Sequence, residues 1–311
     1  MRLAPVAPKS HQSDMTLLSP APEKRRDRLS MTLVSGLMWL PFGMRVAVAG
    51  WIGRNLIGRF SPLRRRVAAS VRHFMPELAT DQVSRIATAV SGNLARMIVE
   101  ILSAEDLARL AATLPIEGPG LAALDEAHAQ GRPAILVSGH FGNYDAWRLA
   151  LIARGYNIGG YFKELGSPAM NDRYVRAVSA SGQPMFPDTG EGRKRLIRFL
   201  RSGGMLGILA DLDRPKGVLV DFLGQPTRTV LSMAEMALKY EAVLVPVFGI
   251  RTPDKPGFRV WIDEPIAHGD ALGMTQALND SFGAQVRAHP EQWVWWHNRR
   301  KKDHPGYRKP R

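Results

Sequence analysis

The sequence of 311 residues contains no cysteine. Disulfide bonds, zinc–thiolate sites and a cysteine nucleophile are therefore excluded. Two other catalytic signatures are also missing from the sequence. No serine lies in a G-x-S-x-G motif, so a covalent acyl-serine has no obvious nucleophile, and no H-E-x-x-H motif marks a zinc hydrolase. We therefore expect neither a metal ion nor a cofactor.

Acidic residues are scarce relative to basic ones. The chain has 28 Asp and Glu against 42 Lys and Arg, which gives a formal net charge of +14. This surplus favours an anionic partner: nucleic acid, an anionic membrane surface, or an acidic carrier or substrate. The basic residues are spread along the chain and accompany no zinc-finger, helix-turn-helix or RNP-like aromatic motif, so we expect no nucleic-acid partner.

Long hydrophobic runs are few, and one near the N-terminus stands out. "MTLVSGLMWLPFGMRVAVAGWIG", residues 31–53, is nearly all apolar and is interrupted by Pro41 and Arg45. About twenty apolar residues span a bilayer. However, an arginine in mid-span costs about 2.5–3.5 kcal/mol, and a proline weakens the helix. We favour an interfacial or shallowly inserted anchor; a true span and a soluble pair of core helices stay open as alternatives.

The chain divides by composition into four parts. Residues 1–30 are predicted to be a disordered basic tail, and 31–60 an apolar, membrane-associated helical segment. Residues 61–302 are predicted to form the main domain, with a helical lead-in over 61–130 and an α/β core over 131–302. Residues 303–311 are a second basic tail.

The core alternates strand-like and helix-like segments. Short β-rich runs ("AILVS", "NIGGYF", "MLGILAD", "GVLVDF", "VLVPVFGI" and "FRVWID") alternate with helical periodicity at about 143–154, 168–181, 190–202 and 229–240. This alternation predicts an α/β fold, with a mostly parallel central sheet flanked by helices on both faces. Thr80 is a plausible helix cap, and Ser232 with Glu235 a plausible capping box.

The stretch "AILVSGHFGNYDAW", residues 134–147, carries the main chemical signal. His140 follows a predicted strand, and the carboxyl ends of strands are where ligands gather in open α/β sheets. Asp145 lies five positions later, so the two can meet only if His140 is on the turn and Asp145 in the first helical turn. Such a pair would make the imidazole a general base. The alternative is that both residues merely cap the turn and the helix.

Six ordered blocks of the chain resemble the late acyltransferases of bacterial lipid A biosynthesis, within the glycerolipid acyltransferase superfamily. "VSGHFGNYD" resembles the family's H-x-x-x-x-[D/E] block, which implies His140 and Asp145 as catalytic residues. The other blocks are "GYFKELGSPAMNDRYVRAVSASG", "GGMLGILADLD", "VDFLGQPTRT", "AVLVPVFGIR" and "PEQWVWWHNRRKK".

The resemblance also implies a set of substrate-binding residues: Lys163, Asn171, Arg176, Asp211, Asp213, Phe222, Gly224 and Arg228. Lys163 stands where the family more often has arginine, Leu212 where it has glutamine, and the D-F-L-G loop departs from the usual form. These departures bear on substrate identity more than on the reaction. Each residue also has a structural alternative, such as a surface charge, a plain turn, or pairing of Asp211 with Arg214.

The resemblance implies a membrane-associated O-acyltransferase at the cytoplasmic face of the inner membrane. Its donor would be acyl carrier protein or acyl-CoA, and its acceptor a hydroxyl of a lipid A precursor or similar amphiphile. A lysophospholipid or ornithine-type lipid acceptor, ester hydrolysis, and a non-catalytic basic binder of membrane or nucleic acid remain alternatives.

Two further segments have open interpretations. "GRKRLIRFLR", residues 192–201, is a basic amphipathic helix that can meet anionic lipid, an acidic acyl carrier, or only solvent. Trp293, Trp295 and Trp296 suit a membrane interface or a partly buried core.

Overall fold

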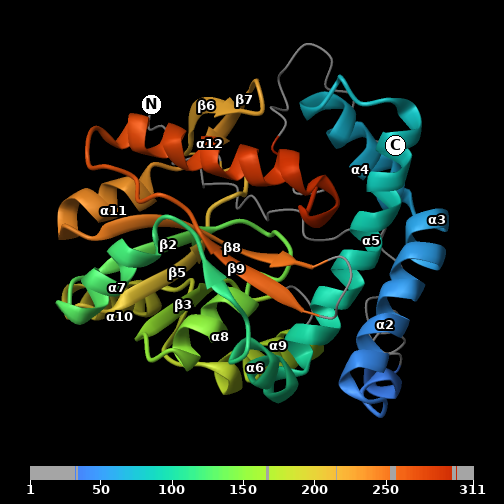
Figure 1. The fold of residues 1–311 in the computed structure, drawn as a ribbon, viewed down its shortest axis with the longest axis horizontal. Helices are drawn as coiled ribbons and strands as arrows, with labels where there is room; N and C mark the ends of the chain where they lie inside the picture. Colours follow the sequence, from blue (N-terminus) through green and yellow to red (C-terminus); the bar gives the residue numbers. More distant parts are fainter. Residues whose placement is uncertain are drawn as a thin grey trace, which may run out of the picture.

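The computed structural model describes residues 32, 34–165, 168–214, 216–252, 257–295 and 299 (Figure 1). The predicted tails at 1–30 and 303–311 lie outside the described residues. The helices are α2 (Phe42–Ile52), a π-helix (Gly53–Ile57), α3 (Gly58–Phe60), α4 (Pro62–Phe74), α5 (Thr80–Leu102), α6 (Ala104–Ala111), α7 (Leu121–Ala129), α8 (Ala146–Ala153), α9 (Pro168–Ser181), α10 (Gly190–Arg201), α11 (Ser232–Tyr240), α12 (Ala271–Ala288) and a 3₁₀ turn (Pro290–Gln292). The strands are β1 (Ile116–Glu117), β2 (Ala134–Ser138), β3 (Ile158–Phe162), β4 (Met185–Pro187), β5 (Met205–Leu209), β6 (Val218–Phe222), β7 (Gln225–Thr229), β8 (Val243–Arg251) and β9 (Phe258–Ile262).

Seven strands form one sheet in the order β1-β9-β8-β2-β5-β3-β4. The five strands from β8 to β4 run parallel, β9 is antiparallel to β8, and β1 is parallel to β9. The predicted mostly parallel sheet is therefore confirmed. The run "GVLVDF" is the exception, because β6 pairs only with β7 in a separate antiparallel hairpin.

The two faces of the sheet bury alternate side chains. On β2, Ile135 and Val137 pack into one hydrophobic cluster, with side chains of α4, α10, α11 and α12. Leu136, between them, packs into a second cluster with α6, α7, α8 and α9. A strand buried on both faces reads as a continuous apolar run, which is why "AILVS" shows no alternation in the sequence. Helices flank both faces, as predicted.

Several helix boundaries differ from the sequence-based expectation. The predicted capping box at Ser232 is wrong, since α11 has Leu231 as its N-cap and no side-chain cap. At the start of α5 the N-cap is Ala79, whose N–H donates to Gln82, so Thr80 is not the cap. Helix α12 was not predicted; Asp270 caps it by accepting from Leu272 and Gly273 N–H.

The apolar N-terminal segment does not form one continuous helix. Pro41 is the N-cap of α2, and the chain then passes through the π-helix into α3, with α5 packed alongside. Arg45 in mid-segment is paired, with Nη2 3.0 Å from Asp106 and Nη1 donating to Ser103. No single helix in the described ranges is long and apolar enough to cross a bilayer; α5 and α6 pass that test only as a pair, bent by 99°.

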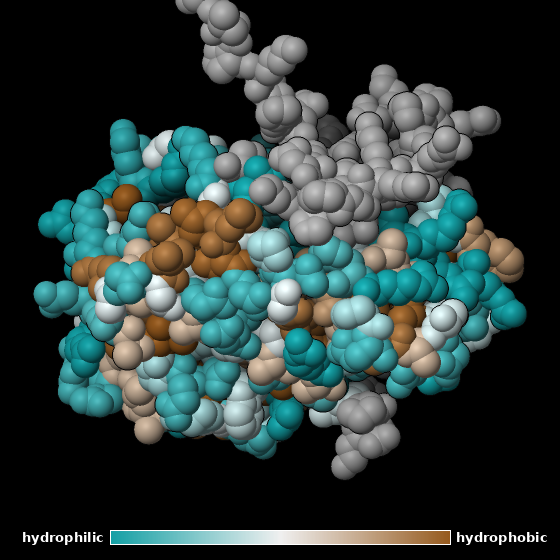
Figure 2. Space-filling model, turned by 90° about the horizontal axis from the view of Figure 1, so that it is seen from above, coloured by the Kyte–Doolittle hydropathy of each residue, from teal (hydrophilic) through white to brown (hydrophobic). Residues whose placement is uncertain are grey.

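Most exposed large hydrophobic side chains of the described chain gather on this segment. We call this set the apolar ridge: Trp39, Met44, Trp51, Leu56, Ile57 and Phe60. The other three in the described part are Ile98, Leu219 and Leu272. Seen from above, the surface is mostly hydrophilic, and its broadest hydrophobic area lies left of centre, away from the end that carries the ridge helices (Figure 2). The ridge helices lie at the right end of the long axis and α10 at the left (Figure 1).

Candidate functional site

The candidate site lies where β2 and β5 leave the sheet. These strands are parallel neighbours, with Ser138 opposite Leu209, so the residues that follow them emerge side by side. His140 follows β2 through Gly139, and Asp211 follows β5. A Cβ added at Gly139 would lie 3.1 Å from Asp211 Oδ2, so glycine here lets the carboxylate approach the backbone closely. Both residues are therefore at the edge predicted for ligands.

Asp211 holds His140 in two ways. The ring Nδ1 of His140 lies 2.8 Å from Asp211 Oδ1, and the backbone N–H of His140 donates to Oδ2 at 2.8 Å. The carboxylate is 1% exposed and the imidazole 19% exposed. Because an ionised carboxylate only accepts, the proton on the ring is assigned to Nδ1. Nε2 is then the basic nitrogen of a half-buried imidazole.

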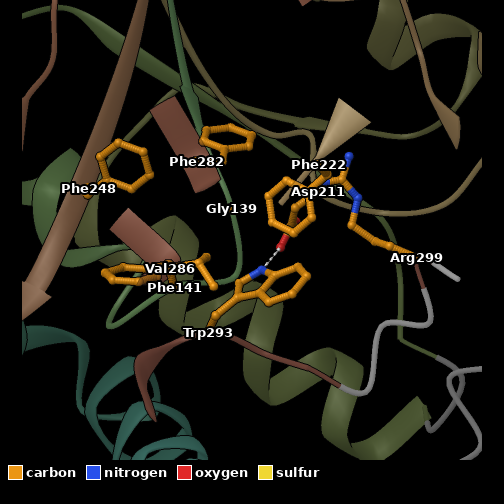
Figure 3. A pocket seen from close by; sticks show the side chains of 9 residues that line it. All are labelled: Gly139, Phe141, Asp211, Phe222, Phe248, Phe282, Val286, Trp293 and Arg299. Carbon is orange, nitrogen blue, oxygen red and sulfur yellow. Dashed lines mark hydrogen bonds between the residues drawn. The ribbon is translucent and has the colours of Figure 1, made fainter. Parts of the chain in front are cut away.

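A third donor to Asp211 comes from the C-terminal end of the fold. Trp293 Nε1 donates to Asp211 Oδ2 at 2.9 Å (Figure 3). Trp293 is 3% exposed, so of its two interpretations the core one is confirmed; Trp295 is also buried, and Trp296 lies outside the described residues. Aromatic rings, among them Phe141 and Phe222, line a small pocket behind Asp211 (Figure 3).

Arg299 lines the same pocket (Figure 3). Its guanidinium stacks 4.4 Å over the Phe222 ring, and Nη2 donates to Thr229 and Asn279. Its Nε and Nη1 find no acceptor among the residues described. Burial lowers the pKa of Arg299 to about 10, while Asp211 and Asp213 act in the opposite direction. A buried cation therefore stands close to the carboxylate that holds His140.

The predicted contact between His140 and Asp145 is wrong. Asp145 is the N-cap of α8, and the expected position of His140 on the turn is correct. However, Asp145 Oδ1 accepts from Arg148 Nε at 2.7 Å, while the imidazole is paired with Asp211. Gly142, between them, has a φ of +54°. Across this turn the side chains of His140 and Asp145 have different partners. The carboxylate beside His140 comes from β5, not from the same motif.

The surroundings of Asp145 are buried and structural. Arg148, 4% exposed, also donates to the carbonyl groups of Val178 and Gly182 at the end of α9. Burial, together with the neighbouring Tyr174, raises the pKa of Tyr144 well above its usual range, and burial also raises that of Tyr174. The ionic pair of this region is therefore Asp145 with Arg148, and it anchors α9 to α8.

A second buried network fixes the loop that carries His140. Glu100 on α5 forms a two-point ion pair with Arg251 at the end of β8, at 2.7 and 2.8 Å. Asn143 Nδ2 donates to the same carboxylate, while its Oδ1 accepts from the N–H groups of Asp145 and Ala146. Helix α5 thus holds the loop between β2 and α8 from outside the sheet.

The C-terminal segment is bonded to the same loop. The N–H of Gly142 donates to Gln292 O, and that of Val294 to His140 O. The side chain of Gln292 in turn accepts from Arg251 N–H and donates to Arg251 O. The position of Trp293 against Asp211 follows from these contacts.

The remaining predicted residues divide into two groups. Phe222 is buried and lines the pocket, and Asp213 pairs with Arg228 at 3.0 and 3.2 Å. The expected alternative of Asp211 pairing with Arg214 is not what the structure has, because Asp211 pairs with His140. Gly224 has a φ of +78° and makes the turn of the β6–β7 hairpin.

The second group lies apart from His140 in the described contacts. Lys163 is exposed directly after β3, and Arg176 is exposed on α9. Asn171 Oδ1 accepts from Leu165 N–H and so ties the start of α9 to the loop before it. Among the described residues, no group of three or more His, Asp or Glu is placed to hold a metal ion.

Comparison with known proteins identifies the class. The family model described as bacterial lipid A biosynthesis acyltransferase matches residues 21–302, so this chain belongs to that family. The matched family is described as one of acyltransferases, which weighs against the non-catalytic alternative.

Relatives fall into two named groups. The phosphatidylinositol mannoside acyltransferase of Mycobacterium tuberculosis is 31% identical over 178 residues, 56% of each chain. The chain thus spans about half the length of these first relatives. A lipid A biosynthesis acyltransferase of Haemophilus influenzae is 22% identical over 262 residues, 83% of this chain and 82% of the relative. The lipid A biosynthesis acyltransferase 2 of Shigella flexneri is 23% identical over 280 residues, 85% of each.

Proposed function

We propose that this enzyme is a membrane-associated O-acyltransferase that uses His140 and Asp211 as its base pair. The fatty acyl chain comes from acyl carrier protein or acyl-CoA and goes to a hydroxyl of a lipid A precursor or a similar glycolipid. The observation that carries the proposal is the partly exposed imidazole held by a buried carboxylate at the carboxyl edge of the sheet. The names of the relatives, which include acyltransferases for two glycolipid classes, support an acceptor that bears sugar hydroxyls.

The reaction needs one proton to move twice. His140 Nε2 takes the proton of the acceptor hydroxyl as the oxygen attacks the thioester carbonyl carbon. The C–O bond forms, and the tetrahedral oxyanion collapses with cleavage of the C–S bond. The departing sulfur then takes the proton from His140. Asp211 accepts from Nδ1 throughout, so it fixes the tautomer and stabilises the imidazolium.

The predicted substrate-binding residues keep their roles as proposals. Lys163, Arg176 and Arg228 are cations suited to phosphate or sugar oxygens, and Asn171, Asp213, Phe222 and Gly224 shape the loops around them. Asp145 takes a positioning role, because its partner is Arg148. A lysophospholipid or ornithine-type lipid is the alternative acceptor.

Catalysis is tested by two variants assayed with a fatty acyl thioester and a lipid A precursor. His140→Ala and Asp211→Asn are expected to lose at least about a hundredfold in kcat while keeping the thermal unfolding midpoint. Turnover by His140→Ala at the wild-type rate would falsify the mechanism. Product analysis with and without acceptor distinguishes acyl transfer from thioester hydrolysis.

The apolar ridge is the proposed contact with the cytoplasmic face of the inner membrane. Its Trp and Phe side chains are 59–91% exposed, and Arg54, Arg59 and Arg65 beside them are exposed as well. Exposed aromatic residues flanked by arginine are typical of helices that lie in an anionic lipid interface. We therefore propose residues 31–60 as an interfacial segment and 61–302 as the acyltransferase domain.

Vesicle binding tests this placement. Trp51→Ser with Phe60→Ser removes two exposed side chains, each contributing roughly 1.5–3 kcal/mol when buried, so binding to anionic vesicles should fall at least about a hundredfold. Leu219→Ser with Leu272→Ser is the matched control, since these side chains are 48% and 50% exposed outside the ridge. Equal losses in the two double variants would sink the assignment.

A further inference from the structure

Helix α10 presents a continuous row of cations to solvent. Lys194, Arg195, Arg198 and Arg201 recur at three- and four-residue spacing, so they share one exposed face. The helix has five basic residues and one acidic residue, a net charge of +4 over twelve residues. Glu191 lies near two of the cations, at 3.2 and 4.0 Å, but pairs this exposed contribute little. The face therefore remains strongly positive.

The opposite side of α10 is fixed to the core. Leu196 and Leu200 are buried in the cluster on the β2 face formed by Ile135 and Val137, and Phe199 packs partly buried against it. Thr189 caps the helix by accepting from Gly192 N–H. The cations are thus held on a helix that is fixed to the core. A docking surface needs such a fixed arrangement, whereas a helix face that only contacts solvent does not.

The placement of α10 distinguishes a protein partner from lipid. None of the exposed large hydrophobic side chains of the described chain belongs to α10. The apolar ridge lies at the other end of the long axis (Figure 1). A molecule held on the membrane by the ridge turns α10 away from the lipid. The cations of α10 then face the water, where an anionic partner is a soluble macromolecule.

The start of α10 lies at the same sheet edge as His140. The helix begins three residues after the last residue of β4, and its start is tied there by Asp188, which accepts from Tyr161 and from Arg193 Nη1. In the sheet, β4 is three strands from β2. At about 4.8 Å per strand this is about 14 Å along the edge. Lys163, which follows β3, lies between the two positions.

We propose that the exposed cations of α10 are the docking surface for an acidic protein that carries the acyl chain as a thioester on a flexible arm. A carrier seated on this row delivers its thioester across β3 to His140, while the lipid acceptor arrives from the membrane side. The inference rests on the proposed function, since it assumes that His140 acts on a thioester. It selects a carrier protein over a free CoA ester as the donor that the surface fits.

The test compares one acyl chain on two donors: purified acyl carrier protein and neutral pantetheine. Lys194→Glu with Arg198→Glu reverses two cations that are 77% and 71% exposed. The kcat/KM for the carrier thioester is expected to fall about tenfold at low ionic strength. The difference from the wild type should shrink as added salt screens the repulsion. The kcat/KM for the pantetheine thioester should not change. Arg72→Glu with Lys239→Glu, at exposed positions on α4 and α11, makes the same charge change outside the row and should leave both donors unaffected.

Four outcomes overturn the inference. Unchanged kcat/KM with the carrier shows that α10 does not bind it, and an equal loss with both donors shows that the effect is not at the carrier. The wild-type enzyme is also assayed with the CoA thioester of the same acyl chain. If it uses this donor but not the carrier, the docking surface is rejected while the proposed function survives. Loss of anionic vesicle binding with unchanged carrier kinetics would instead make α10 a lipid surface. Failure of the wild type with every donor rejects the proposed function itself.

Discussion

Asp211 and Asp145 are two buried aspartates close to the same turn, with opposite surroundings. Asp211 accepts from His140 and Trp293, and its imidazole partner reaches solvent. Asp145 faces Arg148, which is buried and bonded to the end of α9. A carboxylate coupled to a titratable, partly exposed group can support chemistry. A carboxylate paired with a buried arginine is suited to holding helices together.

The comparison teaches that the spacing of a motif does not choose the partner of its residues. Asp145 is close to His140 in sequence, yet Asp211, 71 residues away, makes the contact. Adjacent parallel strands bring their carboxyl ends together whatever their separation along the chain. Here β2 and β5 are neighbours, so the residue after β5 meets the residue after the β2 turn.

The largest effect should follow from Asp211→Asn. The amide has one oxygen where the carboxylate has two. Its NH2 group therefore faces either His140 Nδ1 or both the His140 N–H and Trp293 Nε1. If the amide donates to Nδ1, the ring proton moves to Nε2 and the base is lost. We expect kcat to fall about a thousandfold, with the unfolding midpoint nearly kept. Initial rates at saturating donor and acceptor measure the loss.

Asp145→Asn is the matched comparison for this prediction. It changes the same group in a site of similar burial. The kcat of Asp145→Asn should stay at least about tenfold higher than the kcat of Asp211→Asn. A larger kcat loss for Asp145→Asn, in protein that is fully folded in the assay, would reverse the two roles.

The sequence was sufficient for the fold class and for His140, but not for its partner. Apolar strand runs and helical periodicity predicted the parallel sheet and placed His140 beyond β2. Asp211 was noted only as a residue of another block, because strand order is not encoded locally. Glu100 and Arg251 gave no signal, since a charged residue on a helix or at a strand end is usually solvated. Trp293 was ambiguous between interface and core because an indole combines a large apolar ring with a polar N–H group.

The second prediction concerns the stability of the Asp145 region. Removing one partner of a buried ion pair leaves the other charge uncompensated, which costs about 3–5 kcal/mol. Asp145→Ala should therefore lower the free energy of unfolding by about that amount, and Arg148 is 4% exposed, so water cannot replace the carboxylate. Chemical denaturation followed by circular dichroism measures the change.

A double-variant cycle sharpens the same point. Arg148→Met alone should be strongly destabilising. The double variant Asp145→Ala with Arg148→Met should lose much less unfolding free energy than the sum of the two single losses. Strictly additive losses would mean that the pair does not act as a unit, and the structural role assigned to Asp145 would fail.

The third prediction tests the network that joins the two regions. Asn143 connects Glu100 to the loop between His140 and Asp145. Glu100→Gln should therefore weaken the ion pair with Arg251 and the hold on this loop. The amide keeps the shape of the side chain but loses the charge that faces Arg251. Hydrogen bonds to charged groups contribute about 1.5–3 kcal/mol, and we expect a loss of about 2 kcal/mol in unfolding free energy. Glu77→Gln, an exposed partner of Arg287, should change it by less than about 0.5 kcal/mol.

The smallest effect is expected from Trp293→Phe, and it bears on Asp211 alone. Phenylalanine keeps an aromatic ring against Phe74 and Phe222 but removes the N–H that Asp211 Oδ2 accepts. The carboxylate then keeps its two bonds to His140 and loses some of its fixed orientation. A tenfold fall in kcat, equivalent to about 1.4 kcal/mol, is expected with KM for the donor unchanged. If instead KM rises while kcat stays at the wild-type value, Trp293 contacts substrate and does not position Asp211, and the contrast between the two aspartates loses one of its supports.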